Sequence, residues 1–484
     1  MSRINSNVPS LIAQRHLGLS QRALRTSLER LSSGLKINRG ADDPAGLIVS
    51  ERLRSEIAVV NQAIDNSERA INVIATTEGA LDEVQALLTD IQGLLIQAAN
   101  SGAFSKEEIA ANQLQIDNAI ESITRIANTT TFAGRKLLNG GLDYVTSGIV
   151  STELTDVNVL GAKFGSQPFI GVDVVVSQSA QQAELRFAGP GLGAGGVTLD
   201  VQGPDGITTL TFPANATTVE MVERINSQVD DTGVIAVASG TNGSAGMRIQ
   251  SLDYGSGAFV SVKQAAPNGT FQLVNRAGSV VDYTQGRDAA ATINGIATTA
   301  DGLKLSYSSS PLKVDVVLSE AFGNGSTGLG TSSFAITDGG ALFQLGPQVT
   351  PNLQENIGVK GMQANKLGNA LVGFLSDLKS GQSKSLVSEN FQAASKVVQE
   401  AITQVAVLRG RLGAFERNTL QPNINQLQIT TENLMSSESV IRDTDFAVET
   451  SALTRSQILV QAGNSILAIA NAQSQNVLTL LGGQ

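Results

Sequence analysis

The sequence contains no cysteine and no tryptophan, and its single histidine is His16. The missing thiols exclude disulfide bridges, cysteine nucleophiles and cysteine-based zinc or iron–sulfur sites. One histidine excludes any catalytic or metal site that requires a pair of them. Aromatic residues make up only 4% of the 484 residues. These absences disfavour most classes of enzyme, and we predict no catalytic residue, cofactor or metal ion.

Long apolar runs are also missing. The N-terminal residues 1–8 contain one arginine, but no apolar stretch follows it, as a signal peptide would require. Near the C-terminus the longest apolar run is residues 466–470, whereas a helix that spans a bilayer needs about 20 such residues. We therefore expect no membrane partner, and we expect that a dedicated apparatus exports the protein if it leaves the cell.

Negative charge is concentrated in the middle of the chain. The formal net charge is -10, and residues 141–350 hold 18 acidic but only 9 basic side chains. The two flanking thirds are close to neutral. Binding to nucleic acid phosphates needs a basic face, so nucleic acid is disfavoured as a principal ligand. The distribution indicates two similar ends around a different insert.

The N-terminal third predicts long helices. Its first apolar stripe is narrow and recurs at spacings of three, four and seven, and we expect Gly34 to end this helix. A second stripe from Leu53 to Leu95 predicts one helix about 65 Å long, and a third helix follows over residues 109–123. The first stripe consists of Leu17, Leu24, Leu28, Leu31 and Leu35.

The C-terminal third predicts the matching half of a helical bundle. Apolar stripes cover residues 391–415 and 420–441, and we expect Pro422 to kink or end a helix. Residues 456–484 carry no charge and have apolar residues on all sides. Such a helix requires several neighbours, for which the first helix and copies from other subunits are candidates. The alternative is a terminal helix buried within one monomer.

The middle of the chain predicts β structure. Runs rich in β-branched residues occupy 172–176, 197–201, 209–212 and 314–318, and glycine-containing turns separate them. We expect one helix among them, capped by Thr218. The acidic, Ser-, Thr- and Gly-rich composition indicates one or two β-rich modules that face water.

The two ends of the chain carry several short motifs, at residues 31–38, 42–47, 412–415, 432–434, 441–447, 457–463 and 475–481. These motifs resemble those of bacterial flagellin, the subunit of the flagellar filament. Residues 1–140 and about 340–484 carry the resemblance, whereas residues 217–239 and 252–256 resemble an insert found in some flagellins and hook-associated proteins. The resemblance implies an α+β fold, with long terminal helices in a coiled coil or bundle and an inserted β-rich outer region.

The resemblance also implies a domain order and a function. Residues 1–42 with 450–484 would form an inner coiled coil, 43–175 with 350–449 a helical rod with a short β segment, and 176–349 the solvent-exposed outer region. The protein would polymerise with itself into an extracellular filament for swimming motility. The residues expected in the inner subunit interface are Leu17, Leu24, Leu28, Leu31, Ile458, Leu459, Ile466, Leu467, Ile469, Val477, Leu478 and Leu481.

Further partners follow from the same resemblance. A chaperone would cover the C-terminal helix, a flagellar type III apparatus would export the unfolded chain, and assembly at the distal tip would involve the filament cap and hook-associated proteins. One rod segment departs from the family pattern: Asp90, Gln92 and Gly93 stand where arginine, arginine and glutamate are usual. Because charge-assisted contacts are lost there, we expect weak or no recognition by the toll-like receptor that senses flagellin.

The remaining polar candidates favour structural roles. Asp42 and Asp43 suggest a cation site or an acid/base pair, but no further ligands accompany them, so we expect a turn and a helix cap ahead of Pro44. For His16 a solvent or interface contact is favoured over ligation or pH sensing. The alternative functions are a hook–filament junction protein and, less favoured, an enzyme or a pore-forming toxin.

Overall fold

The computed structural model describes residues 7–100, 102, 104–165, 167–240, 243, 245–266, 271–309, 311–326, 329–388 and 390–481. For residues 266 and 474–481 it describes the backbone alone. The chain divides into two compact units. Unit 1 consists of Met1–Glu68, Leu345–Gln348 and Leu420–Gln484, and unit 2 consists of Arg69–Gln344 and Val349–Thr419.

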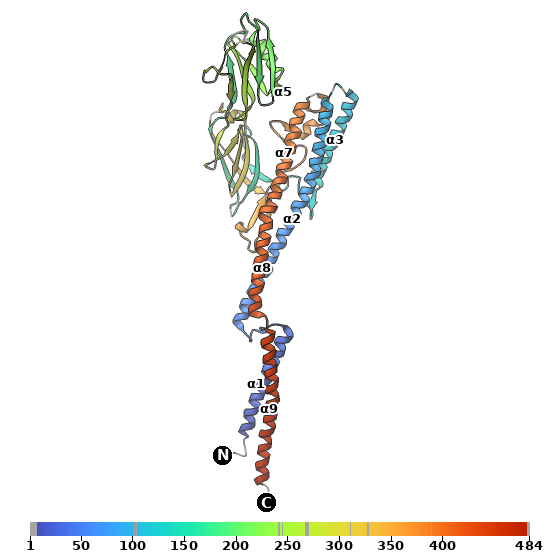
Figure 1. The fold of residues 1–484 in the computed structure, drawn as a ribbon, viewed down its shortest axis with the longest axis vertical. Helices are drawn as coiled ribbons and strands as arrows, with labels where there is room; N and C mark the ends of the chain where they lie inside the picture. Colours follow the sequence, from blue (N-terminus) through green and yellow to red (C-terminus); the bar gives the residue numbers. More distant parts are fainter. Residues whose placement is uncertain are drawn as a thin grey trace. The chain divides into compact units, whose positions relative to one another are not determined.

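Unit 1 is helical. Helix α1 (Val8–Ser33) lies antiparallel beside α9 (Phe446–Leu481), which brings the two ends of the chain together (Figure 1). Residues 44–68 of α2 (Pro44–Ala99) pack against α8 (Gln421–Arg442). The small core between these two helices is formed by Val60, Ala63 and Leu427, with Ile64 and Leu434 at its edge.

The helical part of unit 2 contains the rest of α2, α3 (Lys106–Thr129) and α7 (Phe391–Phe415). A capping box starts α3: the Ser105 side chain accepts from the Glu108 N–H, and the Glu108 carboxylate accepts from the Ser105 N–H. Each helix buries an apolar stripe, and Arg409 on α7 pairs with Asp82 on α2 at 2.9 Å. The long helices expected from the leucine and isoleucine spacing are therefore confirmed. Their buried stripes include Leu81, Leu88 and Ile91 on α2, Ile116, Ile120 and Ile123 on α3, and Val398, Val405 and Leu412 on α7.

The helix break expected at Pro422 lies just before the proline. Helix α7 ends at Phe415, and a π-helical turn, Glu416–Leu420, separates it from α8. Pro422 then lies in the first turn of α8, where a missing N–H leaves no hydrogen bond unmade.

Two β modules with separate cores form the middle of the chain. The first pairs the sheets β15-β14-β5-β19-β3 and β16-β17-β18-β4 around residues such as Val174, Leu305 and Val316. The second pairs the sheets β12-β6-β10-β9 and β13-β11-β7-β8 around residues such as Leu185 and Leu199. Both modules are antiparallel throughout their described pairings, which confirms the β-rich insert and the α+β class.

The second module is inserted into the first between β5 and β14. The chain enters it at Gln181 and leaves it at Arg287, and these two residues form a backbone bridge. Residue 176, where the outer region was expected to begin, lies inside β5 (Ile170–Gln178) of the first module. Thr217 rather than Thr218 caps the helix α4: its side chain accepts from the Glu220 N–H, whereas Thr218 is buried as the first helical residue.

The strands of the first module are β3 (Tyr144–Ser147), β4 (Leu154–Ala162), β5 (Ile170–Gln178), β14 (Ala290–Ile293), β15 (Ile296–Ala297), β16 (Thr299–Asp301), β17 (Lys304–Ser308), β18 (Leu312–Leu318) and β19 (Thr331–Gly339), with helix α6 (Glu320–Gly323). The second module contains β6 (Gln182–Phe187), β7 (Val197–Gln202), β8 (Ile207–Phe212), α4 (Thr218–Asn226), α5 (Val229–Thr232), β9 (Val234–Ser239), β10 (Gly246–Tyr254), β11 (Phe259–Ala266), β12 (Leu273–Asn275) and β13 (Tyr283–Gln285). Short pairs β1 (Thr131–Phe132) with β2 (Arg135–Lys136), β20 (Ala341–Gln344) with β21 (Gln354–Ile357) and β22 (Gly368–Asn369) with β23 (Gly373–Phe374) complete the described strands, and 3-10 turns cover Pro351–Leu353, Leu375–Leu378 and Leu386–Ser388.

Because the two β cores are separate, damage to one should stay local. Leu199 is fully buried in the second module, and Leu199→Ala should cost about 2–5 kcal/mol through lost burial and a cavity. Hydrogen exchange read by mass spectrometry should then speed up in β6–β11 and stay unchanged in β4, β5 and β18. Faster exchange in both groups of strands would show one shared core instead.

Candidate assembly surface

Helices α1 and α9 form an antiparallel pair, named the hairpin, although they come from opposite ends of the chain. Its open end lies at the start of α1, and its closed end lies at the end of α1 and the start of α9. Asn7 fixes the open end. The Asn7 Oδ1 accepts from the Ser10 N–H at 3.1 Å and so caps α1, while its Nδ2 donates to the Ala470 carbonyl of α9 at 3.0 Å. One turn further on, the Ser10 hydroxyl donates to Asn471 Oδ1 at 2.8 Å. A single asparagine thus starts one helix and ties it to the other.

The seam between the two helices is built largely from small residues. Ser10, Ala13 and Ser27 of α1 are buried, as are Ser456 and Ala470 of α9. At Gly463 the helices come so close that a Cβ there would lie 3.2 Å from Leu17 Cδ1 and 3.6 Å from Leu17 Cβ. The half-buried seam residues Leu17, Leu24 and Leu31 alternate along α1 with these small ones, and on α9 the half-buried Leu453, Val460 and Leu467 alternate in the same way.

Large apolar side chains lie outside this seam. Ile458, Leu459, Ile466 and Ile469 of α9 are 59%, 50%, 56% and 66% exposed. Leu28 is 49% exposed and also lies outside the seam, since its neighbour Ser27 is the buried residue at this point of α1. Further exposed apolar residues of the two helices are Val8, Leu11, Ile12, Leu19, Phe446 and Val448.

The expected interface residues therefore fall into three groups. Leu17, Leu24, Leu31 and Leu467 are half-buried, whereas Leu28, Ile458, Leu459, Ile466 and Ile469 are exposed. The side chains of Val477, Leu478 and Leu481 lie outside the described residues. A shallow groove of about 520 Å³ runs along α9 between Thr450 and Leu459. The lone histidine, His16, is exposed on α1.

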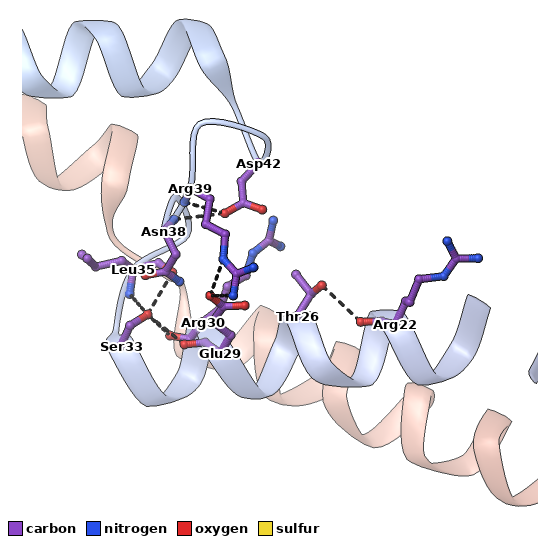
Figure 2. Close-up of polar contacts among 9 residues, drawn as sticks. All are labelled: Arg22, Thr26, Glu29, Arg30, Ser33, Leu35, Asn38, Arg39 and Asp42. Atoms are coloured by element: carbon purple, nitrogen blue, oxygen red, sulfur yellow. Dashed lines mark hydrogen bonds and ion pairs between the residues drawn. The ribbon is translucent and has the colours of Figure 1, made fainter. Parts of the chain in front are cut away.

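Charged residues gather at the closed end of the hairpin. Arg30 of α1 pairs with the buried Glu449 of α9 at 3.5 Å. Figure 2 shows the adjoining turn, where Arg39 donates from Nε and Nη2 to Glu29 Oε1 at 3.0 and 2.8 Å. Arg442, at the end of α8, pairs with Glu51 of α2 at 3.0 Å. These pairs brace the turns, while the outside of the two described helices combines apolar side chains with exposed charges such as Arg15, Arg22 and Arg25 of α1.

Gly34, Asp42, Asp43 and Pro44 shape the turn from α1 to α2. Gly34 has φ of 74° and its N–H donates to the Arg30 carbonyl at 2.8 Å, which closes α1 in the left-handed conformation that favours glycine. Asp42 Oδ2 accepts from the N–H groups of Asn38 and Arg39 at 3.1 and 2.9 Å (Figure 2). Asp43 Oδ1 accepts from the Gly46 N–H at 2.9 Å, and Pro44 is the first residue of α2.

Sequence reasoning missed the small-residue seam and the cap at Asn7. The signal was present: residues 10, 13, 17, 20, 24, 27 and 31 follow a heptad spacing, in which two small residues come first and leucine then alternates with serine. In unit 2, Asp90 and Gly93 are exposed on α2 and Gln92 is half-buried, and a Cβ at Gly93 would meet open space.

The described residues hold no group of three or more histidine, aspartate or glutamate side chains placed to bind a metal ion. Nor do they include a helix of the length and apolarity that crossing a bilayer requires. The chemistry that the described hairpin offers is therefore apolar contact together with charged side chains, which lie along α1 as well as at the closed end.

Comparison with known proteins identifies relatives along the whole chain. The model of the bacterial flagellin N-terminal helical region matches residues 4–142, and that of the C-terminal helical region matches residues 395–481. The flagellin of Salmonella typhimurium is 31% identical over 99% of both chains. Polar flagellin F of Vibrio parahaemolyticus is 31% identical and the B-type flagellin of Pseudomonas aeruginosa 29% identical, again over 99% of both chains.

The close approach at Gly463 allows a direct test of the hairpin register. The distance of 3.6 Å between Leu17 Cβ and a Cβ at Gly463 suits a disulfide. The double variant Leu17→Cys/Gly463→Cys should therefore form an intramolecular disulfide on mild oxidation, seen as a mobility shift on non-reducing gels. The chain has no other cysteine to interfere. Leu28→Cys/Gly463→Cys is the control, and equal cross-linking of both variants would contradict this register.

Proposed function

The chain belongs to the bacterial flagellin family, and from this premise we propose that its subunits polymerise through the outer faces of α1 and α9. It is the structural subunit of a flagellar filament and serves cell motility. Relatives that match over nearly their full length support this function, and no observation favours a hook–filament junction protein. The role is structural, as in the family, and we assign the chain no reaction.

The observation that carries the proposal is the exposed apolar face of the hairpin. Small residues fill the α1–α9 seam, so the larger side chains of Ile458, Ile466 and Ile469 stay exposed. Burying the exposed half of one such side chain contributes about 1 kcal/mol. Summed over both helices and several neighbours, this burial offsets the loss of freedom on association. The uncharged segment 456–484 sets no ionic barrier to close packing between copies.

The domain roles follow this division of surfaces. We assign residues 1–42 with 450–484 to the inner coiled coil, because the apolar hairpin lies there. Residues 43–175 with 350–449 form the rod, whose helices bury continuous stripes of their own. Residues 176–349 form the outer region, since their acidic composition suits contact with water.

Export and partners belong to the same proposal. A chain without cysteine can be kept unfolded and refolded outside the cell without any disulfide chemistry. We propose that a chaperone covers the C-terminal helix before export through the flagellar type III apparatus. The filament cap and hook-associated proteins are the partners expected at the two ends of the extracellular filament.

A charge on the exposed face should block polymerisation. Ile466→Glu would place a carboxylate where subunits pack, and burying it unpaired costs several kcal/mol. We expect no filaments when the purified variant is seeded with short filament fragments and viewed by electron microscopy. Ile296→Glu is the matched control, because Ile296 is also 56% exposed but lies in β15 of the first β module.

Two results would contradict the proposed interface. Long filaments from Ile466→Glu would show that α9 does not pack between subunits. A wild-type chain that only caps the seeds, without extending them, would favour the junction protein over the filament subunit.

Weak recognition by the toll-like receptor remains part of the proposal. Asp90 and Gly93 are exposed and Gln92 is half-buried on α2, and none of the three carries the charge usual in the family. The triple variant Asp90→Arg/Gln92→Arg/Gly93→Glu should raise signalling in a receptor reporter assay at least about tenfold, because each restored charge-assisted hydrogen bond is worth about 1.5–3 kcal/mol. Asp301→Arg, an exposed charge reversal in the first β module, is the control. Strong signalling by the unmodified monomer would refute the expectation.

A further inference from the structure

One face of the second β module carries three arginines. In the sheet β12-β6-β10-β9, Ala183, Leu185 and Phe187 of β6 point into the core, so Glu184 and Arg186 point to the opposite face. Arg186 lies directly across from Arg248 of β10. Glu184 lies across from Gln250 of β10, and Arg276 follows the end of β12 beside it.

A buried carboxylate holds two of these arginines in place. Glu184 is only 3% exposed, although it lies on the outer face. Its Oε1 accepts from Arg186 Nε, and its Oε2 accepts from Arg276 Nη2 at 2.8 Å and from Gln250 Nε2 at 3.3 Å. Burial alone would raise the pKa of Glu184, but the hydrogen bonds from Arg276 and Arg186 outweigh it and lower the pKa. The carboxylate therefore stays charged and orients both guanidinium groups.

The donors that remain point to a ligand. The side chains of Arg186 and Arg276 are 45% and 46% exposed, and each uses only one nitrogen on Glu184. The side chain of Arg248 is exposed and makes no hydrogen bond or ion pair within the described part of the chain. Like charges directly across a strand pair destabilise a sheet. A surface that served solubility alone would not require two arginines in this position.

The charge of this face is opposite to the net charge of its module. Residues 181–286 contain nine acidic and five basic side chains, and three of the five basic ones are these arginines. The neighbouring outward positions hold the aliphatic side chains of Val237 and Val274. The face therefore combines guanidinium donors with a small apolar margin.

We propose that Arg186, Arg248 and Arg276 form a binding site for a sulfated oligosaccharide on the outer surface of the protein. The planar guanidinium fork donates two parallel hydrogen bonds to a tetrahedral oxyanion. Adjacent strands lie about 4.8 Å apart, so the arginines reach neighbouring sulfate groups on one short chain. Val237 and Val274 provide contact for the C–H faces of the sugar rings.

The composition of the module disfavours the other polyanions. Duplex nucleic acid needs an extended basic surface, whereas residues 181–286 are acidic overall and contain only two basic side chains besides these arginines. Single-stranded nucleic acid stacks on aromatic rings, whereas the side chains beside the arginines are aliphatic or amide: Val237, Gln250 and Val274. A short oligosaccharide places a few sulfates on the arginines and needs no basic surface beyond them.

The test measures binding of a heparin-derived sulfated hexasaccharide to the purified monomer by calorimetry at fixed salt. We expect Arg248→Gln to weaken binding about tenfold, the factor that the loss of one charge-assisted hydrogen bond gives. Arg248→Lys, which keeps the charge but lacks the planar fork, should weaken it less. The matched control is Lys263→Gln, which removes one exposed charge from β11 in the other sheet of the module and should leave binding unchanged.

Three outcomes would overturn the assignment. The first is that the desulfated hexasaccharide binds as tightly as the sulfated one. The second is that Lys263→Gln weakens binding as much as Arg248→Gln. The third is that a short DNA duplex of equal charge competes equally well with the hexasaccharide. A fourth would assign the arginines to contact between copies: Arg248→Gln alters polymerisation in the absence of any oligosaccharide. Because binding is measured on the monomer, failure of this site and failure of the filament interface give different results.

Discussion

The close packing of α1 against α9 is the constraint on which the assembly surface depends. Two helices that meet through serine, alanine and glycine approach each other closely, but they bury little apolar area. At Gly463 even one added Cβ would contact Leu17. The large aliphatic residues are thereby left on the outer faces. A hairpin of this kind gains little stability alone, and the proposed assembly, in which other copies cover its outer faces, would couple the folding of these helices to polymerisation.

Ionic contacts are arranged so that they do not interfere with this packing. Arg30–Glu449 and Arg39–Glu29 lie at the closed end of the hairpin, and Arg442–Glu51 lies at the adjoining turn. Exposed pairs of this kind contribute little to stability, but they fix the course of a chain that reverses direction twice. The burial of Glu449 makes its pair with Arg30 the more consequential one, because removal of either partner would leave a charge without compensation.

The sequence predicted the helices where the core is large and failed where it is small. Leu81, Leu88 and Ile91 mark the buried stripe of α2 because large side chains fill a wide space. In α1 the same rule selected Leu28, yet Ser27 is the buried residue, since close approach favours small side chains. The cap of α4 was missed by one residue because Thr217 and Thr218 are adjacent and only geometry distinguishes them. At Pro422 the π turn was invisible to spacing rules, which assume a uniform helix.

The second β module has the greatest freedom to acquire a function of its own. Its core, which includes Leu185, Leu199 and Ile249, is separate from that of the first module. Substitutions at sites without shared contacts add nearly independently, so an unfavourable pair such as Arg186 and Arg248 costs stability only within this module. The helices proposed to carry assembly are not affected by that cost. A surface that opposes the net charge of its module can therefore persist on the insert, provided that a ligand compensates for the repulsion between its arginines.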